Sequence, residues 1–64
     1  MKFLYYHSTA TGYRVYFLKS ILWGLLKYEK SYWVNKGITY VEGANNLDEN
    51  VFILDELKKN ISNV

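Results

Sequence analysis

The residues with chemically useful side chains are too few and too scattered to assemble a reactive centre. The only histidine, His7, precedes Ser8, but nucleophilic catalysis needs a base that a third group holds in position, and none is identifiable. One histidine and no cysteine cannot make a transition-metal site. The neighbouring carboxylates Asp55 and Glu56 would point about 100° apart on a helix, so they cannot act together as acid and base. The sequence predicts no enzymatic activity, no cofactor and no metal.

Aromatic and basic residues at helical spacing offer a binding surface instead. If residues 16–30 are helical, five of them, spaced 3, 4, 4 and 3 positions apart, lie together opposite a leucine-rich arc. Indole rings supply contact area to a protein partner, and ammonium groups attract an acidic one. With the tryptophan of the following segment, the candidate partner-binding residues are Tyr16, Lys19, Trp23, Lys27, Lys30 and Trp33. The sequence leaves open the alternative that Trp23 is a core residue, covered by a loop or by Trp33.

These features favour a binding function. The main hypothesis is a non-catalytic protein-binding module. One form of it is a small inhibitor, encoded by a phage or mobile element, that covers the working surface of a host enzyme. Anti-restriction and anti-CRISPR proteins are inhibitors of this kind. The alternative is a small nucleic-acid-binding regulator whose lysines contact phosphates while Tyr or Trp rings stack on bases. A single arginine and an acidic C-terminal third weigh against that alternative. No membrane partner is expected, whereas a homodimer that closes over the aromatic patch is left open.

Length and composition set the class of protein. A chain of 64 residues makes one domain, residues 1–64, and removes only about 60% of its unfolded surface from water. Half of the residues are hydrophobic, and seven tyrosines, three phenylalanines and two tryptophans are present, so a disordered chain is excluded. The apolar run at residues 21–26 is far shorter than the roughly 20 residues of a membrane span, and residues 2–6 are too short for a signal peptide. A cytoplasmic location is expected.

Two biases run along the sequence. Residue types with AT-rich codons (Phe, Tyr, Met, Ile, Asn, Lys) number 28, against seven for Gly, Ala, Arg and Pro, which favours a free-standing gene of low-GC origin in a bacterium, phage or plasmid. Residues 1–36 carry a net charge of +5 and the remainder −3. The two halves are expected to attract each other or partners of opposite sign.

The N-terminal half is expected to begin with a strand. Residues 2–7 are short and rich in aromatics and end at a turn-forming segment, residues 8–12. Residues 13–18 have high strand propensity and could return as a hairpin, or they could open a helix.

A helix is predicted over residues 21–29 in either case. The apolar residues of this part of the chain fall on one arc of a 3.6-residue wheel: Val15, Leu18, Ile21, Leu22, Leu25 and Leu26. If residues 13–18 are a strand, Ser20 is a natural N-cap for the shorter helix.

Residues 32–41 predict a hairpin. Two β-rich runs are joined by Asn35-Lys36-Gly37, with glycine where a positive φ is wanted. Pairing Val34 with Ile38 would place Tyr32, Val34, Ile38 and Tyr40 on the core face.

The C-terminal segment predicts a second helix that begins after Asn46. Asn46 with Glu49 three positions later resembles a capping box, and acids in the first turn with lysines in the last suit the helix dipole. The expected buried stripe is Leu47, Val51, Leu54, Leu57 and Ile61, which leaves Phe52 on the polar side. The alternative is a strand over residues 51–54 with Asp55 capping a shorter helix.

The predicted fold is therefore α+β. It consists of a small antiparallel sheet of three to four strands with two helices packed on one face.

Overall fold

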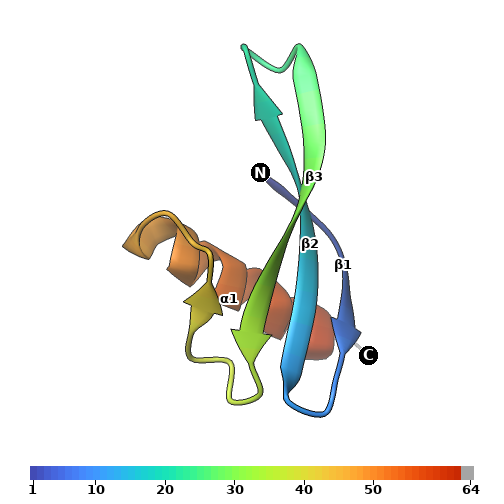
Figure 1. Ribbon diagram of the computed structural model, residues 1–64, viewed down its shortest axis with the longest axis vertical. Helices are drawn as coiled ribbons and strands as arrows, with labels where there is room; N and C mark the ends of the chain where they lie inside the picture. The colour runs from blue at the N-terminus through green and yellow to red at the C-terminus, as the bar shows by residue number, and fades with distance from the viewer. Residues whose placement is uncertain (63–64) are drawn as a thin grey trace.

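The structure, a computed structural model, describes residues 1–62 and consists of one sheet and one helix (Figure 1). The elements in chain order are β1 (Lys2–Ser8), β2 (Gly12–Ile21), β3 (Leu26–Asn35), β4 (Val41–Glu42) and α1 (Leu47–Ser62). The four strands form one antiparallel sheet in the order β1-β2-β3-β4, so each strand pairs with its neighbour in sequence. No helix within residues 1–62 is long and apolar enough to cross a bilayer.

The prediction of two helices is wrong, although the fold is broadly α+β. Residues 21–29 are not helical: they form the end of β2, a turn, and the first part of β3. Every residue from Ile21 to Leu26 is apolar or glycine, and such a run matches a helical and a strand period equally well. The strand-forming residues on either side, residues 13–20 and 27–34, instead pair along the full length of a long hairpin.

The strand interpretation of residues 13–18 is correct. These residues belong to β2, which pairs with β3 from Gly12 opposite Asn35 to Ile21 opposite Leu26. Within it, Val15 and Phe17 are fully buried on the side that faces α1. β1 matches the strand predicted for residues 2–7, and its register against β2 shifts by one residue between Phe3 and Tyr5.

The hairpin predicted over residues 32–41 has a different register. Val34 pairs with Val41, not with Ile38, so Val41 rather than Tyr40 enters the core and Tyr40 stays exposed. The Asn35 side chain holds the longer loop, because its Oδ1 accepts hydrogen bonds from the backbone N–H groups of Thr39 (3.0 Å) and Tyr40 (2.9 Å). A loop closed by this side chain replaces the expected three-residue connection.

Helix α1 begins where the sequence predicted. The Asn46 Oδ1 accepts a hydrogen bond from the backbone N–H of Glu49 at 2.8 Å, as an N-cap does, and the helix continues to Ser62, so the strand alternative for residues 51–54 is wrong. The buried stripe is only partly as expected: Ile53 and Leu57 are fully buried, whereas Leu47 and Val51 are exposed.

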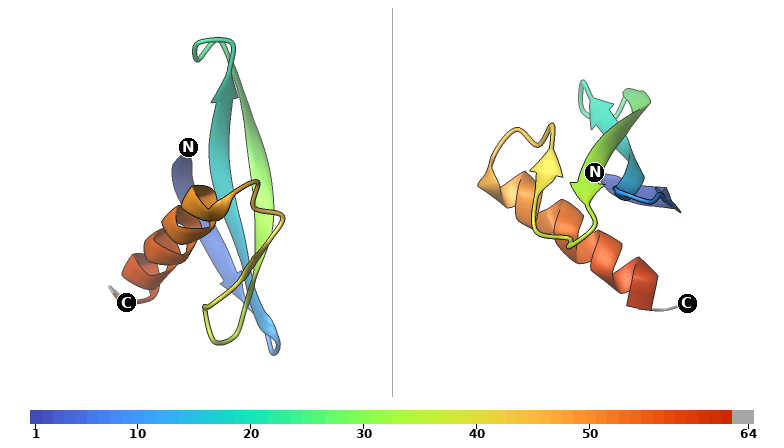
Figure 2. Two further views of the ribbon diagram at one scale, coloured as in Figure 1. Left: turned by 90° about the vertical axis from the view of Figure 1, so that its left-hand side faces the viewer. Right: turned by 60° about the horizontal axis from the view of Figure 1, so that its bottom comes forward.

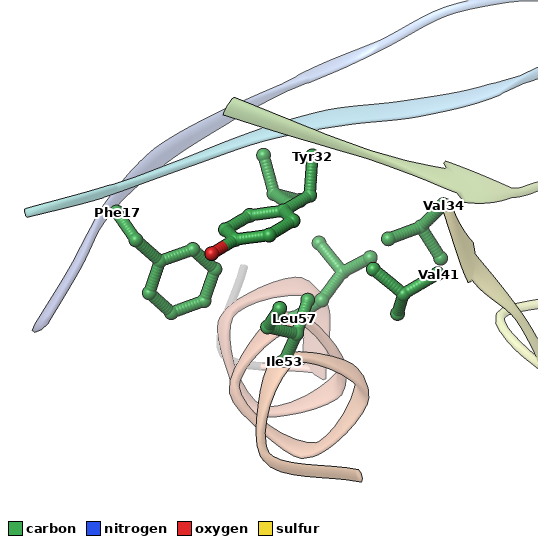
Figure 3. Packing of buried hydrophobic residues seen from close by; sticks show 7 residues of the cluster. Phe17, Tyr32, Val34, Val41, Ile53 and Leu57 are labelled. Carbon is green, nitrogen blue, oxygen red and sulfur yellow. The ribbon is translucent and has the colours of Figure 1, made fainter. Parts of the chain in front are cut away.

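The core lies between α1 and one face of the sheet (Figure 3). Its buried members are Val15, Phe17, Tyr32, Val34, Val41, Ile53 and Leu57. Phe17 lies at its centre, with ring centroids 5.4 Å from Phe3, 5.9 Å from Tyr32 and 6.0 Å from Phe52. The last contact explains Phe52, which packs against the edge of the core although Asp48, Asp55 and Glu56, its neighbours one turn away on the helix, are polar.

The single helix leaves two parts of the sheet uncovered. Figure 2 shows α1 on one side of the sheet, so within residues 1–62 no second layer covers the opposite face. The β2–β3 hairpin also extends beyond the helix, at the top of Figure 1. The pairing of Ile21 with Leu26 continues the hairpin past the last β1 partner, Leu18.

Candidate functional site

The face of the sheet away from α1, called here the outer face, collects aromatic and charged side chains. Because successive side chains of a strand point to opposite faces, the neighbours of the buried Val15 and Phe17 lie on the outer side. Applied through the observed register, this rule assigns the following aromatic and charged residues to the outer face: Lys2, Tyr5, His7, Arg14, Tyr16, Lys27, Glu29, Trp33 and Glu42.

Three aromatic rings of the outer face pack on one another. Tyr5 of β1 and Tyr16 of β2 are stacked, with centroids 4.5 Å apart and planes inclined by 19°. His7 meets both rings edge-on, at 5.6 Å from Tyr5 and 5.7 Å from Tyr16. The pairing of β1 with β2 creates this cluster, which holds its rings in fixed positions at the surface.

A shallow hollow lies beside the aromatic cluster, towards β4. The guanidinium carbon of Arg14 lies 5.4 Å from the centroid of the Trp33 ring, in cation–π geometry. The hollow is lined by Arg14, Ser31, Tyr32, Trp33 and Glu42. A flat aromatic ring, a guanidinium and a carboxylate can together contact a mixed polar and apolar surface.

The charges of the outer face are mixed. Lys2, Arg14 and Lys27 lie on it with Glu29 and Glu42, all of them exposed. The Tyr5 hydroxyl donates a hydrogen bond to Glu29 Oε1 at 3.3 Å, so one of these carboxylates lies beside the aromatic cluster.

The second uncovered feature is the apolar tip of the β2–β3 hairpin, called here the hairpin tip (residues 21–26). Trp23 is fully exposed (102%) and Leu25 is 82% exposed. Leu22 and Trp23 both have positive φ, 53° and 58°, which is unfavourable for residues with large side chains. An apolar surface held in a strained turn is a characteristic of sites that contact another molecule.

The structure separates the six predicted binding residues. Tyr16, Lys27 and Trp33 lie on the outer face and Trp23 lies at the hairpin tip, whereas Lys19 and Lys30 lie on the side of α1. They do not form one surface because the helix that would have aligned them is absent. The alternative of a buried Trp23 is wrong.

The two lysines on the inner side make contacts within the chain. Lys19 Nζ lies 3.4 Å from Glu49 Oε2, and the Tyr32 hydroxyl donates a hydrogen bond to Glu49 Oε1 at 3.1 Å. These two contacts join the sheet to the first turn of α1 and leave little of the Lys19 ammonium for a partner. Lys30 Nζ lies 5.2 Å from the centroid of the Tyr32 ring, a contact within β3.

Glu49 makes stability depend on pH. Burial tends to raise the pKa of this carboxyl, but the backbone N–H of Asn45, the Tyr32 hydroxyl and the Lys19 ammonium hold the pKa below its ordinary value of 4.5. A lowered pKa in the folded state stabilises the fold above the unfolded-state pKa, and this contribution is lost as the pH falls through the folded-state pKa.

We therefore expect Glu49→Gln to lower stability at pH 7 by about 1–3 kcal/mol, and the difference from the native chain to shrink towards pH 3. Thermal melts of both proteins at pH 7, 5 and 3 measure this. Because every other carboxyl titrates in both proteins, the difference between them isolates Glu49. A difference that stays constant down to pH 3 would contradict the assignment.

The sequence did not predict most of the candidate binding residues of the outer face. Tyr5, His7 and Arg14 become neighbours of the predicted Tyr16 only through strand pairing. The available signal was the alternation of residues 13–18, in which Val15 and Phe17 alternate with Arg14 and Tyr16.

No protein-family model matches this chain, and neither a curated protein nor a solved structure matches it. Within residues 1–62, no three His, Cys, Asp or Glu side chains gather as a metal site would require. The arguments for function therefore rest on the outer face and the hairpin tip.

Proposed function

We propose that this chain is a non-catalytic protein-binding module that contacts its partner through the outer face. The observation that carries the proposal is the set of side chains on this uncovered face. Tyr, Trp and Arg are the residue types most enriched among energetically dominant interface residues, and here they are held in place by strand pairing and by contacts with one another. Ordered rings lose little conformational entropy on binding.

The mixture of charges favours a protein over a nucleic acid. Binding to a phosphate backbone depends on a surface with a large excess of Lys and Arg. On the outer face, Glu29 and Glu42 lie among Lys2, Arg14 and Lys27, and both carboxylates would repel phosphates at close range. Mixed charges beside aromatic rings suit a protein surface of complementary pattern.

The narrower form of the proposal is a small cytoplasmic inhibitor encoded by a phage or mobile element. Such a protein needs no reactive group, because it acts by covering a surface that a host enzyme uses. The bias towards residue types with AT-rich codons supports this form.

Reversing the charge of Arg14 tests the proposal. Arg14→Glu removes the cation–π contact with Trp33 and adds a carboxylate beside Glu42, so we expect partner affinity to fall by about 30-fold or more. The measurement is affinity capture from a lysate of the encoding organism, followed by titration of the captured protein.

Lys58→Glu is the matched control, because it changes the net charge equally at an exposed position of α1. Equal capture by native protein and Arg14→Glu, with native circular dichroism, would reject the outer face as the contact surface. Retardation of nucleic acid at low salt that disappears at high salt would favour the alternative function.

A further inference from the structure

Strand β3 has an open edge over most of its length. β4 pairs with only two residues of β3, Trp33 and Val34. Within residues 1–62, no strand pairs with β3 on that side from Leu26 to Tyr32, although β2 pairs with it throughout on the other side. A free edge of this length, extended away from α1, is a template for another strand.

The backbone groups that face the open edge can be identified. The N–H of Asn35 donates to the carbonyl of Tyr40, which lies on the β4 side of β3. Alternate residues of a strand direct their N–H and C=O groups to the same side in an antiparallel sheet. Lys27, Glu29 and Ser31 therefore present their backbone donors and acceptors to the open edge.

We propose that a second copy of this chain pairs with this edge, antiparallel to it, about a two-fold axis at Tyr28. In this register Lys27 of each copy stands opposite Glu29 of the other, at positions where both backbones face the shared edge. Their side chains also share the outer face, so two Lys–Glu contacts form per dimer once each exposed Glu29 turns from the Tyr5 hydroxyl towards the edge. Tyr28 then meets its own counterpart at the axis.

Other two-fold registers are less favourable. An axis at Lys27 or at Lys30 places two like ammonium groups opposite each other, and an axis at Glu29 does the same for two carboxylates. An axis between two residues would oppose residues whose backbones face different edges. Only the axis at Tyr28 pairs opposite charges with matched backbone groups.

In the same register, the hairpin tip of each copy can contact the other copy. Trp33 lies five residues from Tyr28 along β3, about 17 Å, and Trp23 lies five residues from it in the other direction, on the turn beyond the strand end at Leu26. The tip of each copy therefore points along the shared edge towards the hollow beside Trp33 and Arg14 of the other. Contact there would cover the fully exposed indole and provide a reason for the strained turn.

The proposal goes beyond the proposed function and does not depend on it. A dimer of this kind continues the sheet from one copy into the next, while Tyr5 and His7 lie on β1, which β2 and β3 separate from the shared edge, and Tyr16 lies on β2. Because Arg14 lines the hollow that the tip of the other copy would reach, partner capture by Arg14→Glu is judged at concentrations below the dissociation constant of the dimer, and the dimer is judged by the mass of the native chain.

Sedimentation equilibrium of the full chain, over roughly 1 μM to 1 mM, tests self-association. We expect a reversible dimer of 15.2 kDa, twice the 7.6 kDa of one chain. A chain that stays monomeric over this range overturns the proposal, and the tip and edge then serve a different partner.

Charge exchange at the two facing positions tests the register. K27E and E29K each create two like-charge contacts per dimer and should each weaken it about tenfold or more. The double variant K27E/E29K restores opposite charges and should recover the native dissociation constant within about threefold. An equimolar mixture of K27E and E29K should form a heterodimer stronger than either homodimer.

The double variant also controls for the loss of the Tyr5–Glu29 hydrogen bond. The hydrogen bond from Tyr5 to Glu29 is lost in E29K and in the double variant alike, so recovery in the double variant cannot come from this bond. A double variant no stronger than the single variants overturns the register.

Replacing Trp23 tests the placement of the tip. Trp23→Ala should weaken the dimer about tenfold while leaving the melting temperature of the dilute monomer unchanged, because the indole buries nothing within one chain. An unchanged dimer, with the other variants behaving as expected, overturns the contact between the tip and the hollow.

Discussion

Phe17→Ala should destabilise this protein by about 3–5 kcal/mol, enough to leave much of it unfolded at 37 °C. Phe17 is fully buried and its ring contacts Phe3 on β1, Tyr32 on β3 and Phe52 on α1. Removing the ring therefore opens a cavity where three elements meet, and no neighbouring side chain is free to fill it. Urea denaturation followed by circular dichroism measures the loss.

Phe52→Ala is the control for this prediction. Its ring also contacts Phe17 but is 39% exposed, so truncation leaves a gap that water can enter. The expected cost is smaller, about 1–2 kcal/mol. Equal costs for the two substitutions would show that Phe17 is not the centre of the core.

Gly12→Ala should cost about 3 kcal/mol, although it adds a single methyl group. Gly12 is buried at the start of β2, opposite Asn35. A Cβ at this position would collide with the carbonyl oxygen of Val34 and would lie 2.7 Å from Cζ2 of Trp33. Because the first of these atoms belongs to the backbone of the paired strand, the strands can relieve the collision only by separating.

Gly37→Ala tests whether the effect is specific to Gly12. The nearest atom to a Cβ there is the side-chain nitrogen of Asn35 at 3.5 Å, an ordinary contact distance. We expect a change within about 0.5 kcal/mol. Thermal and urea denaturation of both variants decide the comparison, and a stable Gly12→Ala protein would contradict the close packing of Trp33 over β2.

Both substitutions are severe because the domain is small. Domains of this length have a free energy of unfolding of about 3–10 kcal/mol, on the scale of 0.05–0.15 kcal/mol per residue. One core residue or one close contact between strands is thus a large fraction of the total. A second copy paired along β3 would add stability that depends on protein concentration, so melts should be recorded in dilute solution.

Local chemistry determined the elements that the sequence predicted correctly. The β1 strand follows from a run of aromatic residues that ends at a turn, and the start of α1 follows from the Asn46 cap with Glu49 three residues later. Both signals act within a few residues, through side-chain shape and a single backbone hydrogen bond.

Tertiary structure decided the parts in which local signals conflicted. The leucines of residues 21–26 fit a helix, but β2 and β3 pair at ten positions in a hairpin that turns within these residues. The register of β4 depends on whether Val41 or Tyr40 enters the core, and it is settled by the Asn35 side chain within the loop and by the packing of α1 from outside the hairpin. Trp23 is exposed for the same reason, since it lies on a turn beyond the reach of α1 and not on a helix above the sheet. An apolar run can satisfy several periodicities, and only the pairing partners on distant strands select one of them.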